Sequence, residues 1–311
     1  MNLAITGGAG FIGSHLAEYL VKQNHKVLVI DSLKNGNLDN LKTIKNEIEF
    51  FEVDILDYEN LKNILKNVDG VFHEAGLTSV KNSFVKQKEY HDVNVKGTEN
   101  LFKLGKEFGF RVVFASSASV YGMTKKIPIA ENSERNPINP YGKTKFDAEI
   151  LSEQYAKMNT SIIGLRYFNV YGLRQNIEYS GVITKFLERI AENKPPIIHG
   201  DGLQIRDFVY VGDVVRANLA AMQSKTEHAI INIGSGMAIS INDLANMIIK
   251  LSGSIFTSIY DAPQEGDIRE SQADILLAKN LLKWEPQTKL VEWLKDVIPK
   301  IQKAKKFSKL M

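Results

Sequence analysis

The sequence predicts an α/β protein in which a doubly wound parallel sheet is followed by a smaller C-terminal lobe. Three observations predict this fold. Short β-branched runs alternate with helical patterns over the first two-thirds of the 311 residues, a glycine-rich turn directly follows the first run, and after about residue 172 the elements become shorter. Such alternation is typical of parallel strands joined by crossover helices.

Six segments have the length and composition of buried strands: 3–6, 26–30, 48–53, 70–73, 112–116 and 162–166. Between them, apolar residues recur at helical spacing in four segments, 14–22, 58–67, 87–108 and 142–158. The series predicts one unit over residues 1–171, with helices on both faces of its sheet.

Turns interrupt the rest of the chain, at Pro195-Pro196, Gly200–Gly202 and Gly234–Gly236. They indicate a second lobe over residues 172–311, with segments interleaved with the first unit. Ligands of open α/β sheets bind outside the carboxyl ends of the strands. We therefore expect this lobe to cover a ligand site there.

The composition is that of an ordinary globular protein, with 44% hydrophobic and 24% charged residues. The net charge of +3 is too small to indicate a nucleic-acid surface, and no apolar run is long enough to span a bilayer. The chain has no cysteine, which excludes disulfides and thiolate metal sites and is compatible with a reducing cytosol. We expect a cytoplasmic protein that binds neither nucleic acid nor membrane.

The turn after the first strand indicates a dinucleotide site. Gly7, Gly8, Gly10 and Gly13 fit the dinucleotide fingerprint in either of two registers, at the start of a helical pattern. Glycines there let the backbone approach a pyrophosphate at the helix N-terminus. Asp31 ends the second strand, 18 residues after Gly13, where a carboxylate would bond both ribose hydroxyls and repel a 2′-phosphate. The pattern favours NAD over NADP.

Tyr141 and Lys145 form a Tyr-x-x-x-Lys pattern at the start of a predicted helix. Residues four apart share a helix face, so the Lys145 ammonium is expected near the phenol, where a cation lowers a tyrosine pKa and favours proton abstraction. Ser116 and Ser117 end the preceding strand, where a hydroxyl could bond the same substrate oxygen.

Other residues that often carry chemistry have structural explanations. The six histidines show no metal-ligand spacing, and His73 at a strand end is expected to be a packed residue. Trp284 and Trp293 are expected to be core anchors of the small lobe. We expect no metal site.

The chain resembles the extended short-chain dehydrogenase/reductase family, with its Rossmann-type sheet, and within it the UDP-glucose 4-epimerase group. The resemblance covers nearly the whole length and is carried by eight ordered stretches: TGGAGFIGSH (6–15), DI (54–55), HEAG (73–76), VNVKGT (93–98), ASSASVYG (115–122), NPYGKTK (139–145), LRYFNVYG (165–172) and RDFVYV (206–211).

The resemblance implies NAD as cofactor and a UDP-sugar as substrate. Tyr141 would be the acid/base, Ser117 its hydrogen-bonding partner, and Lys145 would also bond the nicotinamide ribose. Asn169 and Arg206 would hold the substrate diphosphate. The implied cofactor contacts are Gly7, Gly10, Phe11, Ile12, Gly13, Asp31, Asp54, Ile55, Ala75, Tyr141 and Lys145, with Asp54 and Ile55 at the adenine.

The implied activity is epimerisation at C4 through a transient 4-keto sugar. Family members that dehydrate commonly have an Asp-Glu pair after the catalytic hydroxyl, whereas Ala118 and Ser119 stand in those places. Epimerisation therefore fits better than the alternative, a nucleotide-sugar 4,6-dehydratase. A non-catalytic NAD-binding module is the alternative of another class, and Ser117, Tyr141 and Lys145 argue against it.

Two positions bear on the substrate. Gln264 stands where the family usually has a diphosphate-binding arginine. We therefore expect Arg206 to contribute more to diphosphate binding, or Arg269 to take over the missing contact. Ser271 matches the position beside the C2 substituent of the sugar, and its small side chain should leave room for an N-acetyl group.

The family also implies a homodimer, in which helices near 87–108 and 142–158 pair with their twofold mates. Support in the sequence comes from apolar residues at helical spacing in the second helix, Phe146, Ile150, Leu151 and Tyr155.

Overall fold

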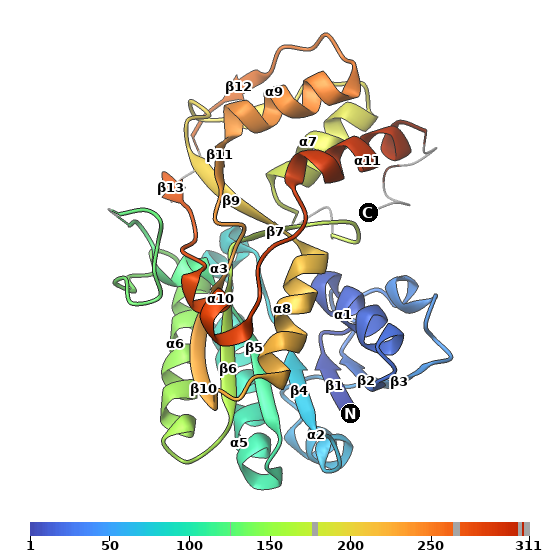
Figure 1. Cartoon of the computed structure of the whole chain (residues 1–311), viewed down its shortest axis with the longest axis vertical. Helices are drawn as coiled ribbons and strands as arrows, with labels where there is room; N and C mark the ends of the chain where they lie inside the picture. The colour runs from blue at the N-terminus through green and yellow to red at the C-terminus, as the bar shows by residue number, and fades with distance from the viewer. Residues whose placement is uncertain (125, 176–179, 264–267, 304–306, 308–311) are drawn as a thin grey trace.

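A computed structural model describes residues 1–124, 126–175, 180–263, 268–303 and 307 (Figure 1). A large sheet with helices on both faces forms the lower part of the molecule in that view, and short strands and helices form a smaller lobe above it. Within the described residues, no helix has the length and apolarity that crossing a membrane would need.

Seven parallel strands form the large sheet in the order β10-β6-β5-β4-β1-β2-β3. They are β1 (Asn2–Thr6), β2 (Lys26–Asp31), β3 (Ile48–Glu52), β4 (Gly70–His73), β5 (Arg111–Ser117), β6 (Ile162–Tyr167) and β10 (His228–Ile233). The chain builds outward from β1 in both directions, so a topological switch point lies between β1 and β4. The predicted doubly wound sheet is confirmed, and its six predicted strands lie within one residue of the observed bounds.

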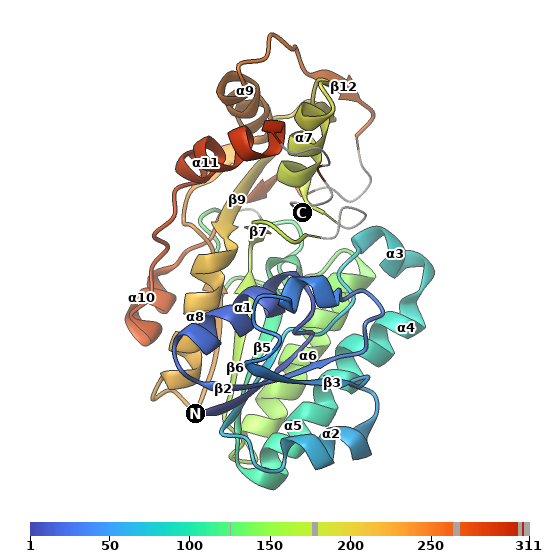
Figure 2. The same ribbon diagram turned by 90° about the vertical axis from the view of Figure 1, so that its right-hand side faces the viewer.

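Helices cover both faces of the sheet and enclose two apolar cores. On one face lie α1 (Phe11–Lys22), α8 (Val211–Gln223) and α10 (Leu276–Leu282). On the other lie α2 (Tyr58–Leu65), α5 (Thr98–Phe108) and α6 (Pro140–Ala156). Figure 2 shows the short helices α3 (Val80–Val85) and α4 (Gln87–His91) on the α6 side.

The helix predicted over 87–108 is interrupted. A π-helical segment, Asp92–Gly97, separates α4 from α5. Short 3₁₀ turns at Leu38–Leu41 and Ala118–Val120, and helix α3, were not predicted. These pieces are too short for a helical period to appear in the sequence.

The smaller lobe is built around β9 (Ile205–Tyr210), which pairs with β7 (Asn169–Tyr171), β11 (Ala238–Ser240) and β13 (Glu270–Ser271). A second pair joins β8 (Ile197–His199) to β12 (Ile259–Asp261). Helices α7 (Val182–Ala191), α9 (Ile241–Ser252) and α11 (Leu290–Lys303) enclose its core.

The two tryptophans belong to different cores. Trp293 packs against the core of the small lobe, as predicted, with its ring 5.0 Å from that of Tyr171. Trp284 instead belongs to the core of the large sheet, and its indole donates to the carbonyl of Asp213 over 2.9 Å. The prediction for Trp284 is wrong because the segment before α11 returns to the side of α8.

The C-terminal half contributes to both parts of the molecule. Strand β9 belongs to the small lobe, but α8 follows it directly and lies on the large sheet, and β10 is that sheet's edge strand. The segments are therefore interleaved, while the boundary at residue 171 stays a prediction.

Candidate active site

A cleft of about 1010 Å³ lies at the carboxyl ends of the large sheet's strands. This is where a topological switch point places ligands. The lining includes Asn169 and Ser117 together with every residue that the sequence assigned to the cofactor: Gly7, Gly10, Phe11, Ile12, Gly13, Asp31, Asp54, Ile55, Ala75, Tyr141 and Lys145.

The glycine turn leaves room that side chains would fill. Gly7 has φ +69°, and a Cβ there would lie 2.6 Å from the backbone nitrogen of Ala75. A Cβ on Gly13 would overlap the carbonyl oxygen of Gly7. Helix α1 begins after Gly10 without a side-chain cap, so its first N–H groups have no side-chain acceptor. The turn thus fits a dinucleotide pyrophosphate.

Asp31 lies at the end of β2, where the backbone holds its carboxylate in place. One oxygen accepts from the N–H of Ala9 over 3.0 Å and the other from that of Leu33 over 2.8 Å. Burial raises the pKa of Asp31, and these two bonds oppose the rise. Each carboxylate oxygen can accept a second bond, so a ribose hydroxyl can still be held.

Asp54 and Ile55 lie further along the same wall. Lys34 forms an ion pair with Asp54 over 2.9 Å. Burial alone would raise the pKa of Asp54, but the bonds from Lys34 and from the N–H of Leu56 leave it below its ordinary value. Ile55 is buried, and a Cβ on Gly97 would lie 2.5 Å from its Cδ1.

Tyr141, Lys145 and Ser117 meet at the other end of the cleft. Asn139 caps α6 by accepting from the N–H of Gly142 over 2.8 Å, and Tyr141 and Lys145 follow in the first two turns. Burial raises the pKa of the Tyr141 phenol, and a hydrogen bond with Ser117 acts in the opposite direction. The predicted set is therefore brought together.

The ammonium of Lys145 does not act as the sequence led us to expect. It donates to the carbonyl of Ala115 over 2.8 Å, and burial lowers its own pKa to about 8. The pKa of Tyr141 is raised rather than lowered, because burial has a larger effect on it than the hydrogen bond with Ser117. The two serines also differ, since the Ser116 hydroxyl donates to Glu149 over 2.6 Å and only Ser117 bonds Tyr141.

Glu74 is a lining residue that the sequence reading did not single out. Its Oε1 accepts from the Tyr167 hydroxyl over 2.8 Å, and burial raises its pKa to about 7, opposed by Tyr167 and Lys145. The only signal for it was its place inside the HEAG stretch. Its neighbour His73 is packed as predicted, between Thr6 and Thr98 at 2.7 and 2.8 Å, and burial lowers its pKa to about 3.

Arg174 is a second lining residue that was missed. It is held over helix α1, with Nη2 2.7 Å from Glu18, and the carbonyl of the preceding Leu173 contacts Nε2 of His15 over 3.0 Å. No local pattern identifies it, because its partners lie more than 150 residues earlier in the chain.

The residues expected to hold the sugar nucleotide lie around β9. Asn169 lines the cleft and donates to the carbonyl of Asp207 over 2.9 Å. Arg206 and Ser271 lie outside the lining of the cleft but are register partners on β9 and β13. The Asp207 carboxylate accepts from the backbone of Ser235 and other groups of the small lobe.

Arg269, the alternative diphosphate ligand, forms an exposed ion pair with Asp201 over 2.8 Å. Gln264 lies outside the described residues.

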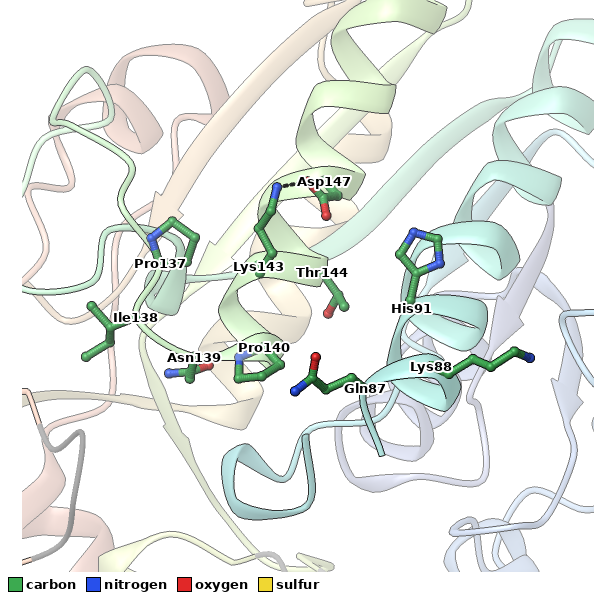
Figure 3. Close-up of a pocket in the computed structure, with 10 residues that line it drawn as sticks. All are labelled: Gln87, Lys88, His91, Pro137, Ile138, Asn139, Pro140, Lys143, Thr144 and Asp147. Carbon is green, nitrogen blue, oxygen red and sulfur yellow. Dashed lines mark hydrogen bonds and ion pairs between the residues drawn. The ribbon is translucent and has the colours of Figure 1, made fainter. Parts of the chain in front are cut away.

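A second hollow, of about 580 Å³, lies outside the cleft between α4 and the start of α6 (Figure 3). Its lining includes Gln87, His91 and Pro140, and Lys143 pairs there with Asp147. It contains none of the residues assigned to cofactor or chemistry. Among the described residues, no three His, Cys, Asp or Glu side chains are grouped as a metal site would need.

Residues 3–234 match the model of the NAD dependent epimerase/dehydratase family. A protein of Methanocaldococcus jannaschii named as a putative UDP-glucose 4-epimerase is 40% identical over 305 residues, which cover 95% of this chain and 97% of that protein.

Solved structures agree with this match. The UDP-glucose 4-epimerase of Thermotoga maritima with UDP-glucose has a TM-score of 0.92 at 35% identity and covers 97% of this chain and 99% of its own. A UDP-N-acetylglucosamine 4-epimerase of Methanobrevibacter ruminantium, in complex with UDP-N-acetylmuramic acid, has a TM-score of 0.91 at 34% identity and covers 96% and 97%. Further matches include NAD complexes, UDP-glucuronate 4-epimerases and a decarboxylase.

Proposed function

The chain belongs to the NAD-dependent epimerase/dehydratase family, and from this premise we propose that it is a 4-epimerase of UDP-hexoses. We propose UDP-glucose and UDP-galactose as one substrate pair and UDP-GlcNAc and UDP-GalNAc as a second. The observation that carries the proposal is the meeting of Tyr141, Ser117 and Lys145 at one end of a cleft whose other end holds the glycine turn and Asp31.

NAD supplies the hydride acceptor and donor for C4 of the sugar. Tyr141 takes the proton of the 4-hydroxyl as the ketone forms and returns it after the ketone has turned over. Ser117 bonds the same oxygen and orients it. Lys145, whose ammonium donates to the carbonyl of Ala115, would also bond the nicotinamide ribose when NAD is bound. Asn169 and Arg206 hold the diphosphate, so the nucleotide stays fixed while the sugar rotates.

Epimerisation needs one acid/base group, whereas dehydration needs more. Ala118 cannot transfer a proton, and the hydroxyl of Ser119 donates to Ser117 over 2.8 Å. These two residues favour epimerisation over a 4,6-dehydratase. We also propose that the enzyme is cytoplasmic and works as a homodimer.

The test is to incubate the purified protein with UDP-glucose, UDP-GlcNAc, UDP-glucuronate and dTDP-glucose and follow each by NMR. We expect C4 epimers from the first two. A 4-keto-6-deoxy product would instead identify a dehydratase, and NAD binding without turnover of any sugar would identify a binding module.

A further inference from the structure

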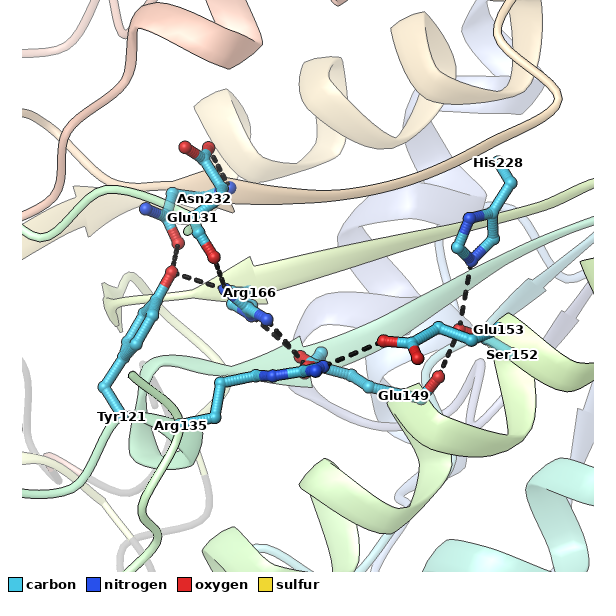
Figure 4. A network of polar contacts seen from close by, with 10 residues as sticks. Tyr121, Glu131, Arg135, Glu149, Ser152, Glu153, Arg166, His228 and Asn232 are labelled. Atoms are coloured by element: carbon cyan, nitrogen blue, oxygen red, sulfur yellow. Dashed lines mark hydrogen bonds and ion pairs between the residues drawn. The ribbon is translucent and has the colours of Figure 1, made fainter. Parts of the chain in front are cut away.

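A buried carboxylate lies on the helix that carries the proposed acid/base. Glu149 on α6 is fully buried, and it accepts from Nε and Nη2 of Arg166 on β6, both over 2.8 Å (Figure 4). Arg135 also approaches it, at 3.3 Å. Nothing in the proposed chemistry uses this group.

Glu149 has one further partner, which lies beside the cleft. The Ser116 hydroxyl donates to its Oε1 over 2.6 Å. Ser116 stands between Ala115 and Ser117 near the end of β5. The carboxylate therefore reaches the strand end that carries the proposed hydroxyl.

Three consecutive residues of β5 are thereby tied to one helix. Ala115 accepts from Lys145, Ser116 donates to Glu149, and Ser117 bonds Tyr141. The three helix residues follow one another at intervals of four, which places them along one face of α6.

Arg166 fixes this carboxylate from the far side. It is 2% exposed, and its Nη1 also donates to the Tyr121 hydroxyl and to the carbonyl of Glu131, over 2.6 and 3.0 Å. A buried ion pair is weak evidence for a role in stability, because desolvation offsets most of the attraction. It does fix the direction of the Glu149 carboxylate, and thus of the bond to Ser116.

We infer that Glu149 is a positioning residue, which through Ser116 fixes the distance between Ser117 on β5 and Tyr141 on α6. Its kinetic consequences rest on the proposed function, but the distance itself does not. A misplacement of about 1 Å at reacting groups can lower a rate about 100-fold.

The test uses Ser116→Ala, since substituting Glu149 itself would leave Arg166 buried without its ion-pair partner. Ser152→Ala is the matched control. Ser152 is also a fully buried serine, on α6 itself, and its hydroxyl donates over 2.7 Å to the backbone carbonyl of Glu149 rather than to the carboxylate. Ser116→Thr restores a hydroxyl on the same carbon and serves as the rescue variant.

We expect Ser116→Ala to lower kcat at least about tenfold with KM within about twofold, and Ser152→Ala to change neither. The rise of kcat with pH should move to higher pH in Ser116→Ala, because a longer distance weakens the Ser117 bond that lowers the pKa of Tyr141. Ser116→Thr should reverse both effects. Crystal structures of the NAD-bound variants should show a longer Tyr141 hydroxyl to Ser117 Oγ distance only in Ser116→Ala.

Equal kcat, pH profile and distance in Ser116→Ala and Ser152→Ala would overturn the inference. If the wild type turned over no nucleotide sugar, the proposed function would fail, while the crystallographic distance would still decide whether Glu149 positions Ser117.

Discussion

The hydroxyl of Tyr167 donates to Oε1 of Glu74 over 2.8 Å and joins the carboxyl ends of β6 and β4 across β5. Asn218 donates to the same hydroxyl over 2.8 Å. The contact fixes the Glu74 carboxyl group in the wall of the cleft, which Lys145 also lines. Burial lowers the pKa of Lys145 to about 8, and Glu74 opposes that fall.

This relationship predicts the pH dependence of cofactor binding. Lys145 should lose its proton as pH rises through about 8, well below its ordinary 10.5, and NAD affinity should fall with it. Since the unfolded chain holds this proton up to 10.5, burial of the charged form costs stability below about 8, and this cost disappears between 8 and 10.5. The neighbouring His73 has a pKa of about 3 and stays neutral across this range.

Glu74→Gln removes the charge that raises the pKa of Lys145, so the loss of NAD affinity should move to lower pH. Calorimetric titration with NAD at a series of pH values measures the midpoint, with the exposed Glu285→Gln as control. An unchanged midpoint in Glu74→Gln would show that the two groups are not coupled.

Tyr141→Phe should lower turnover by about 10²- to 10⁴-fold, because the proton acceptor is lost while the cofactor contacts stay. Bound NAD, measured after denaturation of the purified protein, should remain near the wild-type level. Lys145→Met should lower both. Tyr58→Phe is the control, since Tyr58 is a half-buried tyrosine of α2 outside the cleft, with its hydroxyl donating to Glu107. Wild-type turnover in Tyr141→Phe would contradict the assignment.

Asp31→Asn keeps the shape of the side chain but removes the charge expected to repel a 2′-phosphate. The ratio of the NADP Kd to the NAD Kd should fall about tenfold, which corresponds to roughly 1.4 kcal/mol. Asp69→Asn removes a charge at the amino end of the sheet, where Asp69 accepts from the Asn2 N–H, and should leave the ratio unchanged. A wild type that already prefers NADP would refute the cofactor assignment.

Ser271→Tyr should abolish turnover of UDP-GlcNAc and UDP-GalNAc and spare UDP-glucose and UDP-galactose. Ser271 is 8% exposed on β13, so a bulky side chain there must take up space beside β9. Ser271→Ala keeps that space and should retain both activities. Wild-type protein inert towards the N-acetylated pair would disprove this prediction.

The proposed homodimer should have twice the mass of a single chain in solution. Of the four apolar residues that motivated it, Tyr155 is buried in the chain's own core and Leu151 packs against that core, so the contact must use other residues of α6 such as the half-buried Ile150. Ile150→Asp should yield monomers by light scattering. Ile255→Asp, a fully exposed position on the small lobe, should stay dimeric, and a monomeric wild type would rule the dimer out.

The strands of the sheet were readable because a parallel strand buried on both faces is a continuous apolar run. Strand β10 has only the short apolar run Ala229–Ile231 before Asn232. It joins β6 from some 60 residues later, and no local signal says which sheet a strand will join. The sequence therefore predicted six strands of the sheet but not β10, the edge strand beside β6.

The same distinction applies to the site. Gly13, Asp31 and Tyr141 were recognised because their chemistry depends on spacing within one crossover or one helix. Glu74 and Arg174 were missed because their surroundings come from Tyr167, Asn218 and Glu18, which are brought near only by folding.

The return of the chain to the large sheet has a thermodynamic consequence. A fragment ending at residue 171 would leave β6 as an edge with unpaired backbone groups and would expose the apolar face that α8 covers. The NAD-binding part of the chain thus depends for its folding on α8 and β10, which follow the first strands of the small lobe. We expect the two parts to unfold together as one cooperative unit, so that the binding of NAD and the binding of the sugar nucleotide are lost in the same thermal transition.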